Sequence, residues 1–198
     1  MFFNLDFFKG MVLLSNKDTP VITTNRLILR GKTKKDANAI LGYYTDKNVR
    51  IWLGGYPPTE LNIIKRILKK DNSKYSWAII LKETNQVIGE FDIYHIVEGR
   101  LAELGYILSF ENWGKRYLTE VMQTMIPFAF NTIGLKRLRV SIMTDNKRSR
   151  KLVERMGFIY EAELKEADFG GRIENVCYYS LTPEDYKSVY NMKYITLP

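Results

Sequence analysis

Apolar residues along this chain alternate with polar ones in some stretches and recur at every third or fourth position in others. The first pattern predicts strands, which we place at residues 25–30, 76–82, 87–95, 101–109, 136–143, 159–168 and 173–181. The second pattern predicts helices at residues 34–45, 60–70, 115–132 and 147–156, with a closing helix from residue 183. The order of these elements predicts a mixed α/β domain without internal repeats.

Several predicted boundaries carry residues that favour a turn or a cap. Thr59 and Thr182 each precede a predicted helix and have a hydroxyl suited to capping it. Asn85 lies between two predicted strands, where we expect a hairpin turn. Pro127 falls inside the long central helix and lacks a backbone N–H, so we expect a kink or an early end there.

Length and composition predict one domain over residues 21–198, preceded by an N-terminal arm at 1–20. The chain has 198 residues, 45% of them apolar, which suffices for one substantial core. The arm is apolar but lacks a basic leader, carries Asp6 and Lys9, and is too short to span a membrane. The lone cysteine, Cys177, excludes an internal disulfide, and we expect a core residue in a cytoplasmic protein.

The balance of charge favours a polyanionic ligand or an acidic surface. Thirty basic and 22 acidic residues give a net charge of +8. The densest basic run, residues 147–151, fits a solvated helix face as well as it fits contact with phosphates or an acidic substrate. Charge alone does not separate a coenzyme from a macromolecular partner such as ribosomal RNA. We expect neither a membrane nor a DNA partner.

The segment Trp113–Glu120 joins a predicted strand to a predicted helix. At a helix N-terminus the first backbone N–H groups have no partner within the helix, and the helix dipole adds positive charge. Gly114 allows a ligand to approach the backbone, and Lys115 and Arg116 add charge. The turn therefore suits a pyrophosphate, although most turns of this kind bind nothing.

A second segment, Asp145–Phe158, also follows a strand, opens a helix and ends at a glycine. Together the W-G-K-R-Y-L-T-E turn and this D-N-x-x-S-x-x-x-x-E-x-x-G-F helix resemble the GNAT acyl-CoA N-acyltransferases, in particular the branch that acetylates the N-termini of ribosomal proteins. The resemblance extends from Thr24 to Tyr186. It implies a central, mixed, mostly antiparallel sheet that splays between its fourth and fifth strands, with helices on both faces and acetyl-CoA in the opening.

The resemblance also implies roles for particular residues. Asn146 would contact the pantetheine near the sulfur, and Ser149 would lie near the departing thiolate. The backbone of the fourth strand would pair with the pantetheine, and the amides of the turn would hold the pyrophosphate. The residues concerned are Tyr106, Ile107, Leu108 and Ser109 on the strand, and Gly114, Lys115, Arg116, Tyr117, Leu118 and Thr119 in the turn.

Acyl transfer to an amine needs a proton acceptor, and Glu103 is the preferred candidate because it interrupts an apolar strand. Strand side chains alternate between faces, so Glu103 equally fits a solvent-facing residue or a lysine partner. Glu90 and Asp92 either line the cleft or face water, and Glu120 fits a structural hydrogen bond better. Nothing near His95 in the sequence makes a dyad or a metal set, so we expect a surface or structural role for it and no metal site.

Three residues depart from the family pattern. Arg116 replaces a second glycine of the turn and offers its backbone N–H if its backbone is helical, but its bulk could crowd the diphosphate. Leu118 replaces a small residue. Val153 stands where many relatives have a tyrosine that protonates the thiolate, so Ser149 or water would have to serve.

The sequence says less about the acceptor substrate. Trp52 and Tyr56 lie between the first two predicted helices, where the family builds its acceptor pocket, although Trp52 fits a core position equally well. The resemblance implies transfer of an acetyl group from acetyl-CoA, by direct attack in a ternary complex, to a primary amine. That amine is a ribosomal-protein N-terminus or a small molecule. The alternative is a catalytically inactive module that binds RNA or an acidic protein, and the apolar arm suits a homodimer.

Overall fold

The computed structural model describes residues 19–55, 57–63 and 75–195. The N-terminal arm lies almost wholly outside these residues, as do Tyr56 and most of the helix predicted at 60–70, of which residues 60–63 are helical. The predicted division into an arm and a domain stays a prediction.

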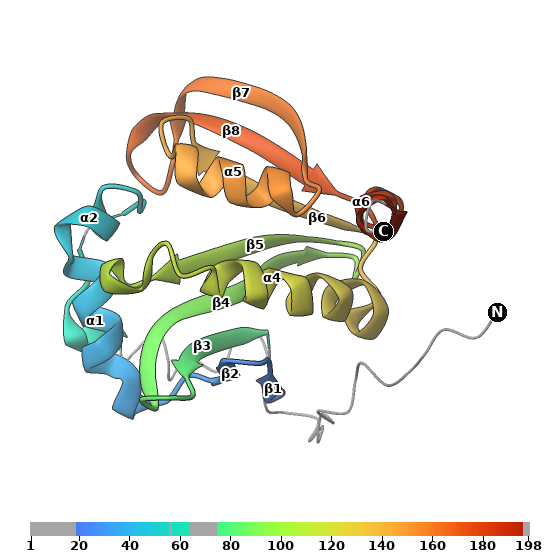
Figure 1. Cartoon of the computed structure of the whole chain (residues 1–198). Helices are drawn as coiled ribbons and strands as arrows, with labels where there is room; N and C mark the ends of the chain where they lie inside the picture. The colour runs from blue at the N-terminus through green and yellow to red at the C-terminus, as the bar shows by residue number, and fades with distance from the viewer. Residues whose placement is uncertain (1–18, 56, 64–74, 196–198) are drawn as a thin grey trace.

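The strands form one eight-stranded sheet in the order β1-β2-β3-β4-β5-β6-β8-β7. Every neighbouring pair is antiparallel except β5 and β6, which run parallel (Figure 1). This confirms the mixed, mostly antiparallel sheet. The strands are β1 Ile22–Thr23, β2 Leu27–Gly31, β3 Ser76–Leu81, β4 Gln86–Val97, β5 Leu101–Leu108, β6 Arg137–Met143, β7 Ile159–Asp168 and β8 Ile173–Leu181.

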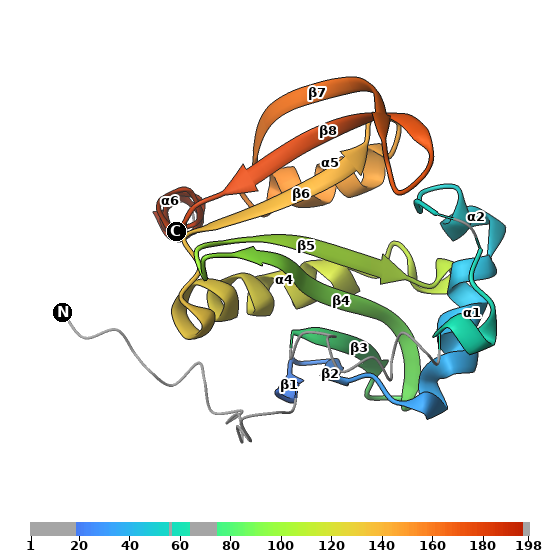
Figure 2. The same cartoon turned by 180° about the vertical axis from the view of Figure 1, so that it is seen from behind.

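The predicted splay between the fourth and fifth strands is present between β5 and β6. Their pairing covers Leu101 with Arg137, Ala102 with Leu138, and Glu103 with Arg139. Beyond Glu103 the two strands part, and Figure 2 shows them diverging toward the end of the sheet where α1 and α2 lie. Residues 104–108 of β5 keep their antiparallel partner β4 on the other side.

Helices pack on both faces of the sheet, as predicted. Val121 and Met125 of α4 are fully buried in the main core, whereas Ile40 of α1 packs in a second cluster with Ile107 of β5. The buried Cys177 belongs to the main core, which confirms its structural role. The helices are α1 Ala37–Thr45, α2 Lys47–Arg50, α4 Tyr117–Pro127, α5 Lys147–Arg155 and α6 Pro183–Ile195, with 3-10 turns at Lys34–Asp36 and Phe110–Asn112.

The predicted boundary signals are confirmed. Helix α4 ends at Pro127 and passes into a π-helix over Phe128–Ile133, because proline has no N–H to continue the α-helical ladder. Asn85 adopts a left-handed turn conformation with φ of 55°. The hydroxyls of Thr59 and Thr182 accept backbone N–H groups at the starts of their helices. Among the described helices none is long and apolar enough to cross a membrane.

Candidate active site

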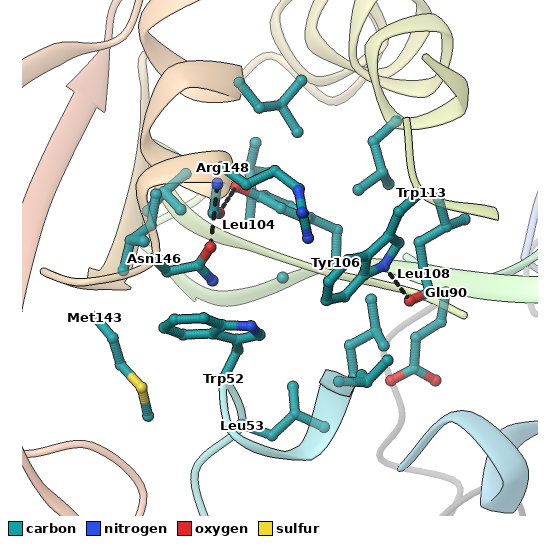
Figure 3. A pocket seen from close by; sticks show the side chains of 18 of the residues that line it. Trp52, Leu53, Glu90, Leu104, Tyr106, Leu108, Trp113, Met143, Asn146 and Arg148 are labelled. Atoms are coloured by element: carbon teal, nitrogen blue, oxygen red, sulfur yellow. Dashed lines mark hydrogen bonds between the residues drawn. The ribbon is translucent and has the colours of Figure 1, made fainter. Parts of the chain in front are cut away.

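A cavity of about 510 Å³ opens where β5 and β6 part (Figure 3). It is bordered by β4, by the N-terminal ends of α4 and α5, by the loop after α2 and by the turn between β7 and β8. The structure thus brings together most of the residues predicted to bind the coenzyme, and also Trp52. The predicted residues that line the cavity are Tyr106, Ile107, Leu108, Gly114, Arg116, Tyr117, Leu118, Thr119, Asn146 and Ser149.

Two predicted coenzyme contacts do not line the cavity. The Ser109 N–H donates to the Ile88 carbonyl at 2.8 Å, and the Ser109 hydroxyl accepts from Asn112 at 2.8 Å. The Lys115 ammonium donates to the amide oxygen of the same Asn112 at 3.3 Å. The side chains of Ser109 and Lys115 are therefore both hydrogen-bonded to Asn112, just before the turn.

Glu103, the preferred base, is also absent from the lining. Its carboxylate accepts from the Arg139 guanidinium at 3.0 Å and lies 3.6 Å from Nδ1 of the exposed His95. The register places Glu103 opposite Arg139, at the last paired position before the strands part. The partner is an arginine rather than the lysine considered above, and the catalytic role of Glu103 stays a prediction.

The turn before α4 has the backbone shape of an anion cradle. Gly114 has φ of +77°, and a Cβ added there would meet nothing within 4 Å. Arg116 has φ of 63° and ψ of 18°, so its backbone is left-handed and does not meet the helical condition under which we expected it to offer its N–H. That conformation costs about 1–2 kcal/mol for a residue with a side chain. Arg116 thus keeps the backbone shape that glycine adopts easily.

Glu120 ties this turn to the start of β2. Its carboxylate accepts the Thr24 hydroxyl at 2.5 Å, and the Arg26 backbone N–H and Nε at 2.7 Å. Arg26 in turn donates to the Lys115 carbonyl at 3.1 Å and lies over the Tyr117 ring. Burial opposes ionisation of Glu120, but the hydrogen bonds from Thr24 and Arg26 outweigh it and hold the pKa of Glu120 below its usual range. This fits the structural role expected for Glu120.

Replacing Glu120 with glutamine is expected to lower the free energy of unfolding by about 1–2 kcal/mol at pH 7, because the charged acceptor of three hydrogen bonds is lost. A depressed folded pKa stabilises the protein above the unfolded pKa, and that contribution is lost as pH falls through the folded pKa. The difference should therefore shrink below about pH 4. Denaturant unfolding across pH measures it, with exposed Glu98→Gln as the control.

The second motif forms the other wall. The Asn146 amide oxygen accepts the Ser149 N–H at 3.1 Å and caps α5. The Ser149 hydroxyl lies 2.6 Å from the Tyr106 hydroxyl. Burial raises the pKa of Tyr106, and the hydrogen bond to Ser149 offsets only part of that rise, so the phenol keeps its proton at neutral pH. Val153 is fully buried in the core and supplies no proton.

Basic side chains gather on the side of the cavity formed by the turn and α5. The Arg148 guanidinium lies over the Trp113 ring at 4.2 Å, and Arg116 and Arg155 also line the cavity. Arg150, in the same basic run, instead donates to the Tyr179 hydroxyl at 2.9 Å and has a structural role. The run therefore serves more than one purpose. The pairing of Trp113 with Arg148 was not predicted, since it joins two motifs 35 positions apart.

The opposite side of the cavity is acidic and aromatic. Glu90 and Asp92 of β4 line it together with Tyr44 and Tyr94, which answers the open question about the two carboxylates. Figure 3 shows Trp52 and Glu90 on the side of the loop that carries Leu53, across from Arg148. Trp52 is only half-buried, so it walls the cavity and does not plug the core.

The loop after α2 meets the turn between β7 and β8, and both segments line the cavity. The Arg172 guanidinium donates to the carbonyls of Ile51 and Leu53 at 3.1 and 3.2 Å. A Cβ on Gly54 would lie 2.5 Å from the Phe169 carbonyl oxygen, so the two backbones touch. The contact joins residues more than a hundred positions apart, and nothing local in the sequence signals it.

The sheet opens between two parallel strands, and the N-terminal ends of α4 and α5 border the cavity there, an arrangement that suits a phosphate-bearing ligand. The model of the acetyltransferase (GNAT) domain matches residues 26–159. The chain belongs to the GNAT family of acetyltransferases and is an acyltransferase. Within the described residues no three His, Cys, Asp or Glu side chains are placed to hold a metal ion.

Known relatives are similar over most of the chain. The uncharacterized N-acetyltransferase p20 of Bacillus licheniformis is 30% identical over 172 residues, which cover 82% of this chain and 96% of that protein. The ribosomal protein uS5-alanine N-acetyltransferase of Escherichia coli is 26% identical over 165 residues, 77% of this chain and 84% of that protein. A GNAT-family acetyltransferase from Bacillus anthracis has the same fold, with a TM-score of 0.75 at 22% identity, covering 83% of this chain and 99% of that one.

Proposed function

We propose that this protein transfers the acetyl group of acetyl-CoA to a primary amine by direct attack in a ternary complex. The observation that carries the proposal is the two-ended cavity, which has an anion cradle and arginines on one side and carboxylates with aromatic rings on the other. A phosphate-bearing donor suits the first side, and an ammonium suits the second. GNAT acetyltransferases use acetyl-CoA as their co-substrate.

The residues of this chain suit the donor in three places. The first amides of α4, with Gly114 and Arg116 before them, would hold the pyrophosphate, and Arg148 adds a cation nearby. The edge of β5 that β6 leaves after Glu103 would pair with the amide groups of the pantetheine arm. Arg116 and Leu118 line the cavity without closing it, so the departures from the family pattern do not argue against binding.

The chemistry follows from this placement. The amine nitrogen attacks the thioester carbonyl carbon, a C–N bond forms, and the C–S bond breaks. The departing thiolate takes a proton from the Ser149 hydroxyl, and the proton that the attacking nitrogen loses as the amide forms returns to Ser149 by way of the Tyr106 hydroxyl, 2.6 Å away. No covalent enzyme intermediate is involved.

The acceptor is proposed to be a ribosomal-protein N-terminus or, failing that, a small amine. The similarity to a ribosomal-protein alanine N-acetyltransferase supports the first choice, and the carboxylates that line the cavity suit either. The alternative of an inactive module that binds RNA or an acidic protein is weaker, because the family is one of acetyltransferases and the cradle is open. A homodimer through the N-terminal arm and a cytoplasmic location stay predictions.

Calorimetric titration with acetyl-CoA, followed by free-thiol release with amines and ribosomal-protein N-terminal peptides, tests this function. We expect saturable binding and turnover with one class of acceptor. Absence of acetyl-CoA binding, together with salt-sensitive binding to RNA, would favour the inactive module instead.

A further inference from the structure

A buried ion cluster forms the floor of the acidic end of the cavity. The Lys32 ammonium lies 2.9 Å from Oε2 of Glu90 and 2.9 Å from Oδ1 of Asp92. Only 8% of the Lys32 side chain is exposed, so this cation is committed to the pair. Two carboxylates share one lysine here, and the cluster carries a net charge of about −1 when all three groups are ionised.

The two carboxylates differ in what surrounds them. Glu90 is 2% exposed and accepts hydrogen bonds from the hydroxyls of Tyr44 at 2.6 Å and Tyr43 at 3.2 Å. Asp92 accepts the Ser76 hydroxyl at 2.5 Å, yet its side chain keeps 27% exposure. Asp92 is therefore the member of the pair that a ligand in the cavity can reach.

The strand register places Asp92 beside the part of β5 that β6 leaves unpaired. Asp92 pairs across the ladder with Gly105 of β5, and Glu90 pairs with Ile107. This is the stretch of β5 along which the proposed function lays the pantetheine arm. The Tyr94 ring covers Gly105, since a Cβ there would lie 3.0 Å from the ring, and Tyr94 lines the cavity as well.

We propose that the Glu90–Asp92 pair receives the acceptor as an ammonium ion and that Asp92 takes the proton the amine must lose, an inference that rests on the proposed function. Carboxylates framed by the rings of Tyr44, Trp52 and Tyr94 are a setting that recognises an organic cation. One N–H bond of the ammonium breaks, the proton passes to the Asp92 carboxylate, and the freed nitrogen lone pair attacks the thioester carbon.

The same chemistry defines the acceptor class. An amine whose adjacent carbon carries a carboxylate would bring a third negative charge to Glu90 and Asp92 and would be repelled. The site therefore takes primary amines without a neighbouring carboxylate, which describes both peptide N-termini and polyamines. A free amino acid falls outside that class.

The electrostatics of the cluster support a base at this position. Burial raises the pKa of the Asp92 carboxyl, the Lys32 charge opposes that rise, and the Glu90 charge adds to it. The charged and titratable groups that face Asp92 are Lys32, Glu90 and Tyr94. Burial, with the charges of Glu103 and Asp92, raises the pKa of Tyr94 to about 12, so its phenol does not compete for the proton.

The test compares Asp92→Asn with Glu103→Gln and with exposed Glu163→Gln, using an alanine-initiated peptide amide, spermidine and free alanine as acceptors. Asp92→Asn should lower kcat/KM for the reactive amine by about 100-fold while the Kd for acetyl-CoA stays within about twofold. Its residual rate should climb with pH toward the pKa of the amine, because only free amine can then react. Glu163→Gln should match wild type, and free alanine should not be acetylated.

Variants at Lys32 test whether Asp92 acts as a base or only forms a structural ion pair. Loss of this cation in Lys32→Met removes the charge that opposes the rise of the Asp92 pKa, so the acid limb of the kcat/KM profile should move to higher pH. Lys32→Arg keeps the charge and should restore the wild-type limb, even if both variants are less stable.

Three results would overturn the inference. The first is an Asp92→Asn enzyme with wild-type kcat/KM and pH profile, and the second is the base phenotype appearing in Glu103→Gln instead. The third is efficient acetylation of free alanine. Failure of the wild-type protein to bind acetyl-CoA would be distinct from these, since it would overturn the proposed function as well.

Discussion

Replacing Gly114 with valine is expected to weaken acetyl-CoA binding by about 100-fold or more. Gly114 has φ of +77° in the turn that precedes α4, and an added side chain would project into open space at the cavity. A branched side chain at this angle is strained and would stand where the pyrophosphate approaches the backbone amides. Loss of one or two hydrogen bonds to a charged group, at about 1.5–3 kcal/mol each, accounts for a change of this size.

Gly134 provides a matched control for Gly114→Val. It has φ of +86°, a Cβ there would also meet nothing within 4 Å, and it ends the π-helix outside the cavity lining. Both valine variants should lose about 1–3 kcal/mol of stability from backbone strain. Calorimetric titration should show the loss of acetyl-CoA affinity in Gly114→Val alone. Equal acetyl-CoA affinities in the two variants would show that the turn before α4 does not bind the pyrophosphate.

Replacing Ser149 with alanine is expected to lower kcat by about 100-fold, because the thiolate then loses the hydroxyl that protonates it. The Kd for acetyl-CoA should change little. The Ser149 backbone N–H still bonds to Asn146, so the loss of stability should be limited to about 1 kcal/mol from the missing hydrogen bond to Tyr106. Ser141→Ala is the control, because Ser141 lines the same cavity. Single-turnover thiol release measures the effect on the chemical step.

Tyr106→Phe tests whether the two hydroxyls act as a unit. We expect a smaller loss, about tenfold, because Ser149 would still donate but would be resupplied by water. The double variant Tyr106→Phe with Ser149→Ala should then be no slower than Ser149→Ala alone, since residues that act together are not additive. A fully additive loss would place Tyr106 outside the proton path, and unchanged kcat in Ser149→Ala would remove Ser149 from the mechanism.

The order of the elements and the position of both motifs at the starts of helices were predictable from the sequence. Period, caps and turn residues act over a few positions, so Thr59, Asn85 and Pro127 fixed boundaries without knowledge of the fold. The N-cap of α5 by Asn146 is equally local. The resemblance to the family then supplied the splayed sheet, and the parting of β5 from β6 after Glu103 confirms it.

The partners of the charged side chains were not predictable, because they depend on strand register and on segments distant in sequence. Glu103 lies opposite Arg139 only because β5 and β6 pair in parallel at that residue. Lys32, from the end of β2, reaches two carboxylates of β4 about 60 positions away. The alternation of residues along β4 shows that Glu90 and Asp92 share a face of the strand. It does not show whether that face lines a cavity or meets water, because this depends on what packs against the sheet.

The sequence by itself therefore determined the order of the elements, the turn before α4 and the family, since each depends on residues close together in the chain. The tertiary structure alone decided which carboxylates line the cavity, as Glu90 and Asp92 do, and which pair elsewhere, as Glu103 does with Arg139. It also decided which loops meet beside the cavity, where the loop at Gly54 contacts the turn at Phe169. Ionic and backbone contacts of this kind form only when folding brings distant segments within a few ångströms, and local pattern carries no record of them.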